Sequence, residues 1–324
     1  MVVARPGFAA ALALDQVSEL VYRAVAVDGR PGRIFGGQIM AQSLAAAGRT
    51  VQPDQHPHML HARFAGPGDP ARPLVLTLDP IDDGGSFSRR RVVVTQEGKQ
   101  VLELSASFHR DEAGPEHQAL IASSSSPDAV PSVDDLPPYD ERTRQWWARL
   151  TTWLPVEIRS NVIPGRWAAP GPDPAEPRQQ LWLRTRDELP DDRLMHSCAA
   201  AYASDLFLLT AAMVRHGVRH DDGGVFAVTL NHTMWFHHPF RADHWWLYDQ
   251  EGVWTGAGRS LCRGQMFDRS GRLVATSMQE GLLRVRDGVP RTHPPRLPAA
   301  ERTVHPVPSR GARAESERST CTCR

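Results

Sequence analysis

The feature that most constrains the fold of this chain is an internal repeat. Each half contains an apolar helix pattern followed by a strand, a turn with proline and three further strands. Two landmarks give the spacing, because Arg63-Phe64 corresponds to Trp235-Phe236 at an offset of 172 residues and Gly98 corresponds to Gly271 at an offset of 173. Agreement within one residue indicates a duplication, so the chain is predicted to fold as two similar units.

Hydrophobic periodicity assigns the elements within each half. Helices are expected at 38–48 and 196–217, and the strand at 101–108 alternates cleanly between apolar and polar residues. Such alternation is typical of a sheet with one packed face. The expected strands are 58–64, 73–81, 86–96, 101–108, 225–240, 244–254, 259–271 and 272–284.

A helix followed by an antiparallel meander, present twice, predicts an α+β protein in which a sheet curls around a central helix in each unit. This architecture is the double hotdog, with two tandem repeats, each with a central helix wrapped by an antiparallel sheet. The two sheets are expected to pair edge to edge, since each unit alone leaves exposed strand edges.

Composition divides the chain into four ranges. The N-terminal hotdog is expected at 1–112, and the C-terminal hotdog, which carries the candidate catalytic residues, at 181–286. Between them, 113–180 is interpreted as a connector rich in proline and serine, with an aromatic island whose tryptophans pack onto a domain rather than recognise a ligand. The range 287–324 has almost no apolar residues and is predicted to be a disordered tail.

Charge and motif content exclude several classes of function. The chain has 37 basic and 37 acidic residues, so no overall field attracts it to nucleic acid. Lys99 is its only lysine, which argues against lysine-based catalysis. Phosphate-binding and dinucleotide-binding loops, the serine-hydrolase elbow and the zinc-protease motif are absent from the sequence. The 14 histidines lack a second ligand pair at metal spacing, so neither a metal nor a cofactor is expected.

Cysteine use and the apolar runs bear on localisation. Four cysteines, two of them at the extreme C-terminus, form no disulfide framework and fit a reducing cytosol. The first apolar run is short and meets Asp15, so no export signal is expected. The longest apolar stretch, 198–214, contains Asp205 and is interpreted as a buried helix rather than a membrane span. A cytoplasmic protein is predicted.

The most informative single residue is Asp205, because it lies in a helix pattern that is apolar on nearly all faces. A carboxylate in such a place is costly to bury unless polar partners hold it, so either a catalytic or a structural role is open. Thr229 and Gln279 also lie among apolar strand neighbours. An acid, a hydroxyl and an amide that converge in an apolar groove could hold and activate one water molecule for hydrolysis.

Six short motifs give the sequence a family resemblance. They occur in the family's order within about 12–112 and 152–286, whereas both ends of the chain lie outside the likeness. Together they resemble the acyl-CoA thioesterase II family, whose members have a double hotdog fold. The motifs are FGGQIMAQSL at 35–44, PGDP at 67–70, GGSFSRRRV at 84–92, YASDL at 202–206, HTMWFHHPF at 232–240 and TSMQEGLLR at 276–284.

The resemblance implies a catalytic trio of Asp205, Thr229 and Gln279, which match the family's helix Asp, strand Thr and last-strand Gln. It also implies a thioester substrate, fatty acyl-CoA, hydrolysed to free fatty acid and CoA. Departures from the family pattern, such as Asn231 where the family often has Asp, concern surface loops and substrate range.

Two further groups are candidates for substrate binding. Gly36 and Gly37 open a helix whose backbone N–H groups could stabilise an oxyanion, although the pair could equally serve only a tight turn. Arg89, Arg90 and Arg91 could meet the phosphates of CoA, although a charged run on a strand is usually a solvated face.

Two rival functions remain open. One is a hotdog hydratase or dehydratase acting on an acyl thioester, and the other is a non-catalytic acyl-CoA-binding protein. The trio favours water attack on the carbonyl over both. By analogy of fold a homo-oligomer, either a dimer or a tetramer of double hotdogs, is expected.

The two halves are predicted to differ in function. The first helix has no acid between Gly37 and Gly48, and Ala106 stands where the offset of 173 places Gln279. One complete site per chain is therefore expected, with the first helix contributing its glycine-rich start.

Overall fold

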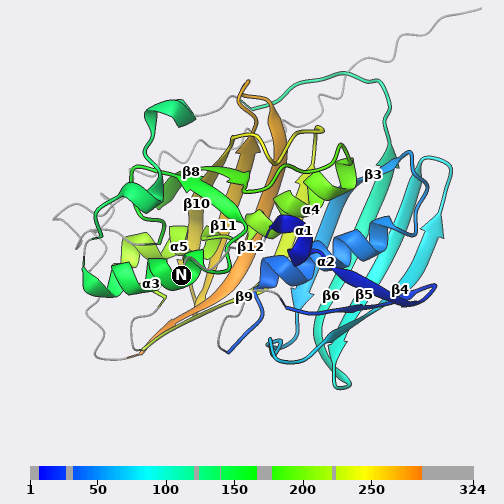
Figure 1. Ribbon diagram of the computed structural model, residues 1–324, viewed down its shortest axis with the longest axis horizontal. Coiled ribbons are helices and arrows are strands. Elements are labelled where there is room, and N and C mark those ends of the chain that lie inside the picture. The colour runs from blue at the N-terminus through cyan, green and yellow to red at the C-terminus, as the bar shows by residue number, and fades with distance from the viewer. Residues whose placement is uncertain are drawn as a thin grey trace, which may run out of the picture.

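The computed structural model confirms two similar α+β units whose strands join in one sheet (Figure 1). The predicted tail, 287–324, lies outside the described part of the chain. The residues that the structure describes are 7–26, 32–119, 124–138, 140–165, 177–220 and 224–286.

The first unit is built around one central helix. Helix α2 is rich in alanine and other good helix formers and lies across one face of its sheet, where nearly every side chain is buried. The elements of this unit are α1 (Phe8–Ala11), β1 (Leu14–Ser18), β2 (Val21–Ala24), α2 (Gly36–Gly48), β3 (Gln55–Phe64), β4 (Leu74–Asp83), β5 (Phe87–Gln96) and β6 (Lys99–Arg110).

The second unit repeats this order after a connecting segment. The segment contains two 3-10 turns, Pro127–Ala129 and Val133–Asp135, and helix α3 (Glu141–Thr151). The elements that follow are β7 (Val156–Arg159), β8 (Arg178–Thr185), α4 (Arg193–Ser204), α5 (Leu208–Met213), the 3-10 turn Val214–His216, β9 (Val225–Phe236), β10 (Trp246–Gly256), β11 (Arg259–Phe267) and β12 (Leu273–Val285).

The strand order shows the duplication directly. It is β1-β2-β4-β5-β6-β3 in the first unit, continued by β9-β12-β11-β10-β8-β7 in the second, which is the corresponding order reversed. The units meet edge to edge through the antiparallel pair β3 and β9, as predicted. In that pair His61 lies opposite Thr233, and the two side chains, 172 residues apart, form a 2.8 Å hydrogen bond. The predicted offset therefore relates two residues that face each other at the junction.

The predicted extent of the connector differs from the structure. Strand β7 lies inside 113–180, and β8 begins at Arg178 and pairs with β10. These two strands are the counterparts of β1 and β2, because each pair lies at an outer edge of the sheet. Short edge strands give a weak alternation signal, and the surrounding prolines hid them in the composition.

The predicted single helix at 196–217 is also corrected. It breaks after Ser204 into α4 and α5, and Phe207 at the break has a left-handed backbone with φ 61°. Two buried glutamines explain the break. Gln250 Nε2 donates to the carbonyl of Leu206 at 2.7 Å, and Gln179 Nε2 donates to the carbonyl of Phe207 at 3.0 Å. The carbonyl of Leu206 at the break is thus satisfied from the sheet, and the carbonyl of Phe207, which also accepts the N–H of Thr210, gains a further bond from it.

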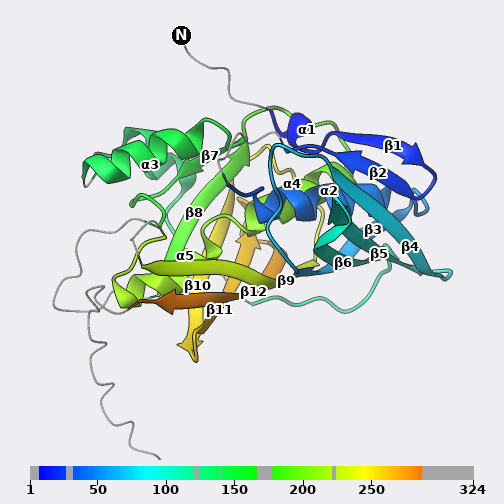
Figure 2. The same ribbon diagram turned by 90° about the horizontal axis from the view of Figure 1, so that it is seen from below.

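The two long helices, α2 and α4, pack against each other on the inner face of the sheet, as Figure 2 shows. The stretch Arg193–His216 is long and apolar enough to span a membrane by length and composition, but 83% of its most apolar window is buried within the fold. That degree of burial is what a core helix shows. Gly37 makes the close approach of the two helices possible, because a Cβ there would overlap the backbone oxygen of Tyr202.

Candidate active site

A cavity of about 640 Å³ lies where the two units and the connector meet. Its walls are mainly apolar and come from α2, the turn after β3, helix α3, the break between α4 and α5, and β9. An apolar cavity with a few convergent polar groups is the usual form of a small-molecule site. The polar side chains that line this cavity include Arg33, Asp205, Thr210, His220, Thr229 and Gln279.

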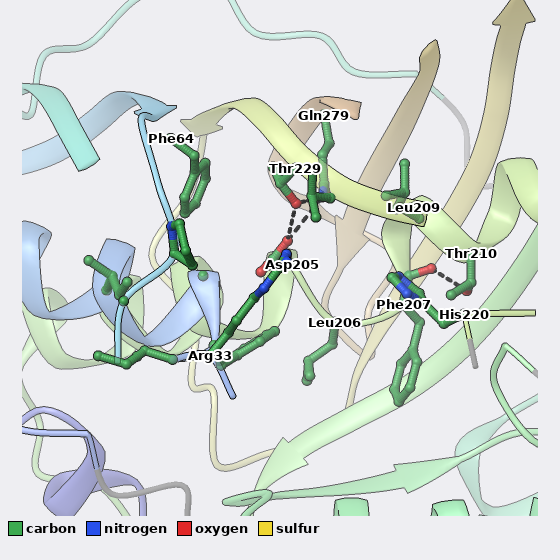
Figure 3. A pocket seen from close by; sticks show the side chains of 18 of the residues that line it. Arg33, Phe64, Asp205, Leu206, Phe207, Leu209, Thr210, His220, Thr229 and Gln279 are labelled. Carbon is green, nitrogen blue, oxygen red and sulfur yellow. Dashed lines mark hydrogen bonds between the residues drawn. The ribbon is translucent and has the colours of Figure 1, made fainter. Parts of the chain in front are cut away.

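The structure brings the three predicted catalytic side chains together in this cavity (Figure 3). Gln279 Nε2 donates to Asp205 Oδ1 at 3.0 Å and to Thr229 Oγ1 at 2.6 Å. Thr229 Oγ1 donates to the same Asp205 oxygen at 3.3 Å. The acid, hydroxyl and amide therefore form one hydrogen-bonded group at the wall of an apolar cavity.

Local irregularities of the backbone place two members of the trio. Asp205 is the C-terminal cap of α4, so its side chain projects from the point where the helix breaks. Thr229 lies beside a β-bulge, because Thr229 pairs with Gly281 and Asn231 with Glu280, which leaves Leu230 as the extra residue. Bulges re-aim neighbouring side chains and are common next to active sites.

The first helix also reaches the trio. Gly37 donates its backbone N–H to Asp205 Oδ2 at 3.0 Å, and Gly36 lines the cavity. The start of α2 thus faces the carboxylate, where the helix dipole favours negative charge. The predicted oxyanion position lies at the site, and one of its two N–H groups holds the acid.

The predicted CoA-binding arginines do not line this cavity. Arg90 is buried and donates to Thr50, whereas Arg89 pairs with an acid on the neighbouring strand β4. Arg91 donates to Glu103 at 3.1 Å. The structure does not bring the three side chains to the trio, and their contact with CoA stays a prediction. Arg33, which sequence reasoning missed, lines the cavity close to the start of α2.

The connector contributes more to the site than its composition indicated. Trp146, Leu150 and Trp153 line the cavity, and Trp153 is also buried in the core. Trp146 contacts Phe207 of the helix break, with the ring centroids 6.2 Å apart. Tryptophans predicted only to pack therefore form part of a cavity wall. Trp146 and Leu150 are four residues apart on α3, whereas Trp153 lies beyond its end, so no single helical spacing links the three.

The first unit has a counterpart of this cavity without the same polar side chains. A smaller cavity of about 120 Å³ is lined by His56, Pro57 and His58 together with residues 236–240. At an offset of 172 these correspond to residues 228–230 and 64–68 of the larger cavity. Pro57 stands for Thr229 and Ala106 for Gln279, so the hydroxyl and the amide are both missing.

Other reactive groups give no competing mechanism. Burial raises the pKa of the Cys262 thiol to about 12 and also raises the pKa of Cys198, so neither is a thiolate near neutral pH. Within the described ranges no group of three or more His, Cys, Asp or Glu side chains is arranged to hold a metal ion.

Acidification is expected to destabilise the fold through His232, a fully buried neighbour of Gln279. Burial lowers the pKa of His232 from 6.5 to about 4, so the unfolded chain binds a proton at a higher pH than the folded chain does. The resulting stability is present above pH 6.5 and is lost as the pH falls toward 4, in total roughly 3 kcal/mol. Chemical unfolding of wild type and His232→Asn at neutral pH and at about pH 5 measures this difference.

The matched control for that experiment is His117→Gln, because His117 is exposed. His117→Gln should lose stability with acidification as steeply as wild type, whereas His232→Asn should lose less. Equal pH dependence in all three proteins would contradict the assignment to His232.

Comparisons with known proteins agree with this geometry. Residues 157–282 match the family model described as acyl-CoA thioesterase, and residues 27–109 match the model for the acyl-CoA thioesterase N-terminal domain. Human acyl-coenzyme A thioesterase 8 is 36% identical over 268 residues, which cover 79% of this chain and 82% of the human protein. Acyl-CoA thioesterase 2 of Haemophilus influenzae is 31% identical, with 84% of this chain and 95% of that protein covered.

Comparisons with solved structures agree with these sequence comparisons. The crystal structure of an acyl-CoA thioesterase II from Mycobacterium marinum has 38% sequence identity and a TM-score of 0.71, with 87% of this chain and 100% of that chain covered. A protein with a hot dog fold from Alicyclobacillus acidocaldarius has a TM-score of 0.67 at 20% identity, covering 86% of this chain and 98% of its own, which supports the fold alone. The double hotdog prediction is confirmed, and the chain belongs to the acyl-CoA thioesterase II family.

Proposed function

We propose that this acyl-CoA thioesterase hydrolyses fatty acyl-CoA to free fatty acid and CoA by direct attack of water on the thioester carbonyl. The observation that carries the proposal is the hydrogen-bonded trio of Asp205, Thr229 and Gln279 at the wall of a largely apolar cavity. With Asp205 as the general base for a water molecule, the reaction requires no acyl-enzyme intermediate.

In the proposed reaction Asp205 accepts one proton from the attacking water, and the water oxygen forms a bond to the carbonyl carbon. Thr229 and Gln279 fix the direction of attack, because both are already hydrogen-bonded to the carboxylate that takes the proton. As the carbon–sulfur bond breaks, the thiolate of CoA receives the proton from Asp205, which restores the carboxylate. The N–H of Gly37 holds Asp205, so the N–H of Gly36 at the start of α2 is the one offered to the developing oxyanion.

The shape of the cavity supports an acyl substrate. Its apolar wall includes Trp146, Leu150 and Trp153 from the connector. Arg33 and His220 provide polar contacts in the same cavity, and Figure 3 shows both among its lining side chains. In this proposal the acyl chain packs on the aromatic wall while the polar side chains contact the CoA portion.

A panel of acyl-CoA substrates, with free thiol release measured against chain length, tests this function. Thiol release with one equivalent of fatty acid is expected. A hydratase would instead add water to an unsaturated acyl-CoA and leave the thioester intact. A binding protein would retain acyl-CoA without releasing thiol, so either result would contradict the proposal.

One turnover centre per chain is expected, because Pro57 and Ala106 replace the hydroxyl and the amide in the first unit. Isothermal titration of the purified protein with a slowly hydrolysed acyl-CoA analogue should therefore give one tight site per chain. The Pro57→Ala variant is the control and should keep the same stoichiometry. Two equivalent tight sites per chain would contradict the single-site prediction.

A further inference from the structure

The trio is backed by a second row of polar groups in the core that no step of the proposed reaction uses. His232 lies on β9 directly opposite Gln279 on β12, and both side chains are essentially inaccessible to solvent. Ser204, the last residue of α4, is fully buried beside them and forms a 2.9 Å hydrogen bond with His232 Nε2. Ser204, His232 and Gln279 thus run in sequence from the helix end to the trio.

Two atoms in this row have no partner within hydrogen-bond geometry among the described residues. They are Gln279 Oε1 and His232 Nδ1, both of which are buried. An unpaired buried acceptor beside an unpaired buried nitrogen is costly, and a small adjustment pairs them. Burial lowers the pKa of His232, whereas the hydrogen bond with the Gln279 side chain raises this pKa. A rise in pKa is what an oxygen acceptor close to the ring produces.

The tautomer of the ring depends on which of two acceptors the Ser204 hydroxyl uses. The hydroxyl of Ser204 has two acceptors in reach, the carbonyl of Ala201 at 2.8 Å and His232 Nε2 at 2.9 Å. When Ser204 donates to Nε2, the neutral imidazole carries its proton on Nδ1, where it faces Gln279 Oε1. The amide oxygen is then held toward the ring, and the amide nitrogen must face Asp205 and Thr229, as observed.

The first unit provides an internal comparison. In the register of the sheet Leu60 pairs with Ala106 in the same way that His232 pairs with Gln279. The same place in the same fold is therefore packed with two apolar side chains in the unit that lacks the trio. The architecture therefore does not require a buried imidazole and a buried amide at this pair of positions. Of the two units, the one with the polar pair is the one that carries the trio.

We propose that His232, held by Ser204, is a positioning residue that donates from Nδ1 to Gln279 Oε1 and so fixes the orientation in which the Gln279 amide donates to Asp205 and Thr229. Without this bond the amide can rotate by half a turn and present its oxygen to the carboxylate, which repels it. The inference rests on the proposed function of the trio.

A double-mutant cycle tests it, with variants taken from the first unit. His232→Leu and Gln279→Ala each change one member of the pair to its first-unit counterpart, and the double variant reproduces the Leu60 and Ala106 pair. The double variant is therefore expected to fold, and the melting temperature of each protein is measured beside its kcat. His232→Leu should lower kcat about tenfold or more, with little change in KM, because it removes positioning and not substrate contact. In the Gln279→Ala background the same change should have no further effect on kcat.

A conservative variant and a spectroscopic measurement separate positioning from a structural role. His232→Asn keeps an N–H donor near the position of Nδ1 and should recover part of the lost kcat. Nitrogen NMR of histidine-labelled wild type should show His232 as the neutral Nδ1–H tautomer at neutral pH, and the Nδ1 signal should shift in Gln279→Ala. The Nε2–H tautomer in wild type, or full kcat in His232→Leu, would overturn the proposal.

The same measurements distinguish a failure of the proposed function from a failure of the inference about His232. If Gln279→Ala itself keeps the wild-type kcat, the trio is wrong, whereas the tautomer measurement still reports whether His232 holds Gln279. If Gln279→Ala loses activity but the two changes reduce kcat independently in the double variant, the trio stands and the positioning role of His232 is wrong.

Discussion

The kcat of the Asp205→Asn variant is expected to fall by a factor of about 10² to 10⁴, because the amide cannot accept the proton of the attacking water. The fold should be kept, because the amide is nearly isosteric with the carboxylate. The Asn side chain can still accept the N–H of Gly37 through its oxygen, so the contact of this residue with helix α2 is preserved. Free thiol release measured at saturating acyl-CoA, together with the melting temperature, separates the loss of chemistry from the loss of structure.

Glu280→Gln is the matched control for this variant. Glu280 follows Gln279 on β12 and therefore points to the opposite face of the sheet, where it accepts hydrogen bonds from Asn231 and Arg259. Removing its charge should leave kcat unchanged. Near wild-type thiol release from a folded Asp205→Asn protein would remove Asp205 from the mechanism.

The parts of the fold that follow from periodicity were predicted from the sequence. The offset of 172 predicted two units, and it also relates His61 to Thr233, which pair at their junction. A repeated element leaves the same polar and apolar pattern in both copies, so a single spacing is informative about the whole architecture. The convergence of Asp205, Thr229 and Gln279 was predicted from polar residues in apolar surroundings together with a family resemblance.

The features that sequence reasoning missed depend on contacts between distant segments. The break after Ser204 is stabilised by Gln179 and Gln250 from two strands, and neither residue is near the break in the sequence. Helix propensity favours a continuous helix there, and tertiary hydrogen bonds override it. Likewise, only the packing of α3 shows that Trp146 reaches the cavity. A propensity pattern has no information about such contacts.

The two units can contribute different groups to one site because α2 and α4 approach each other closely. One unit supplies the acid, the hydroxyl and the amide, and the other supplies the N–H of Gly37 that holds the acid. A site that is shared in this way requires the two helices to keep a fixed separation. Any change that pushes the helices apart should therefore affect stability and activity together.

Gly37→Ala is expected to produce that double effect. A Cβ at this position would overlap the backbone oxygen of Tyr202, and a backbone atom cannot rotate away as a side chain can. Overpacking of this kind costs about 1–3 kcal/mol or more of the free energy of unfolding. It should also move the N–H of Gly37 away from Asp205 Oδ2 and reduce kcat by at least about tenfold, since a misplacement near 1 Å can cost that much.

Gly48→Ala tests whether this effect is specific to the shared site. Gly48 ends the same helix, and its added Cβ would lie 2.5 Å from carbons at the end of the flexible Leu194 side chain, which can move. Gly48→Ala should therefore unfold at a denaturant concentration close to that of wild type and keep its kcat. The Gly37→Ala protein should show both losses in the same unfolding and thiol-release measurements. If Gly37→Ala is as stable and as active as Gly48→Ala, close packing of α2 against α4 does not position the acid, and the N–H of Gly37 is not needed to hold it.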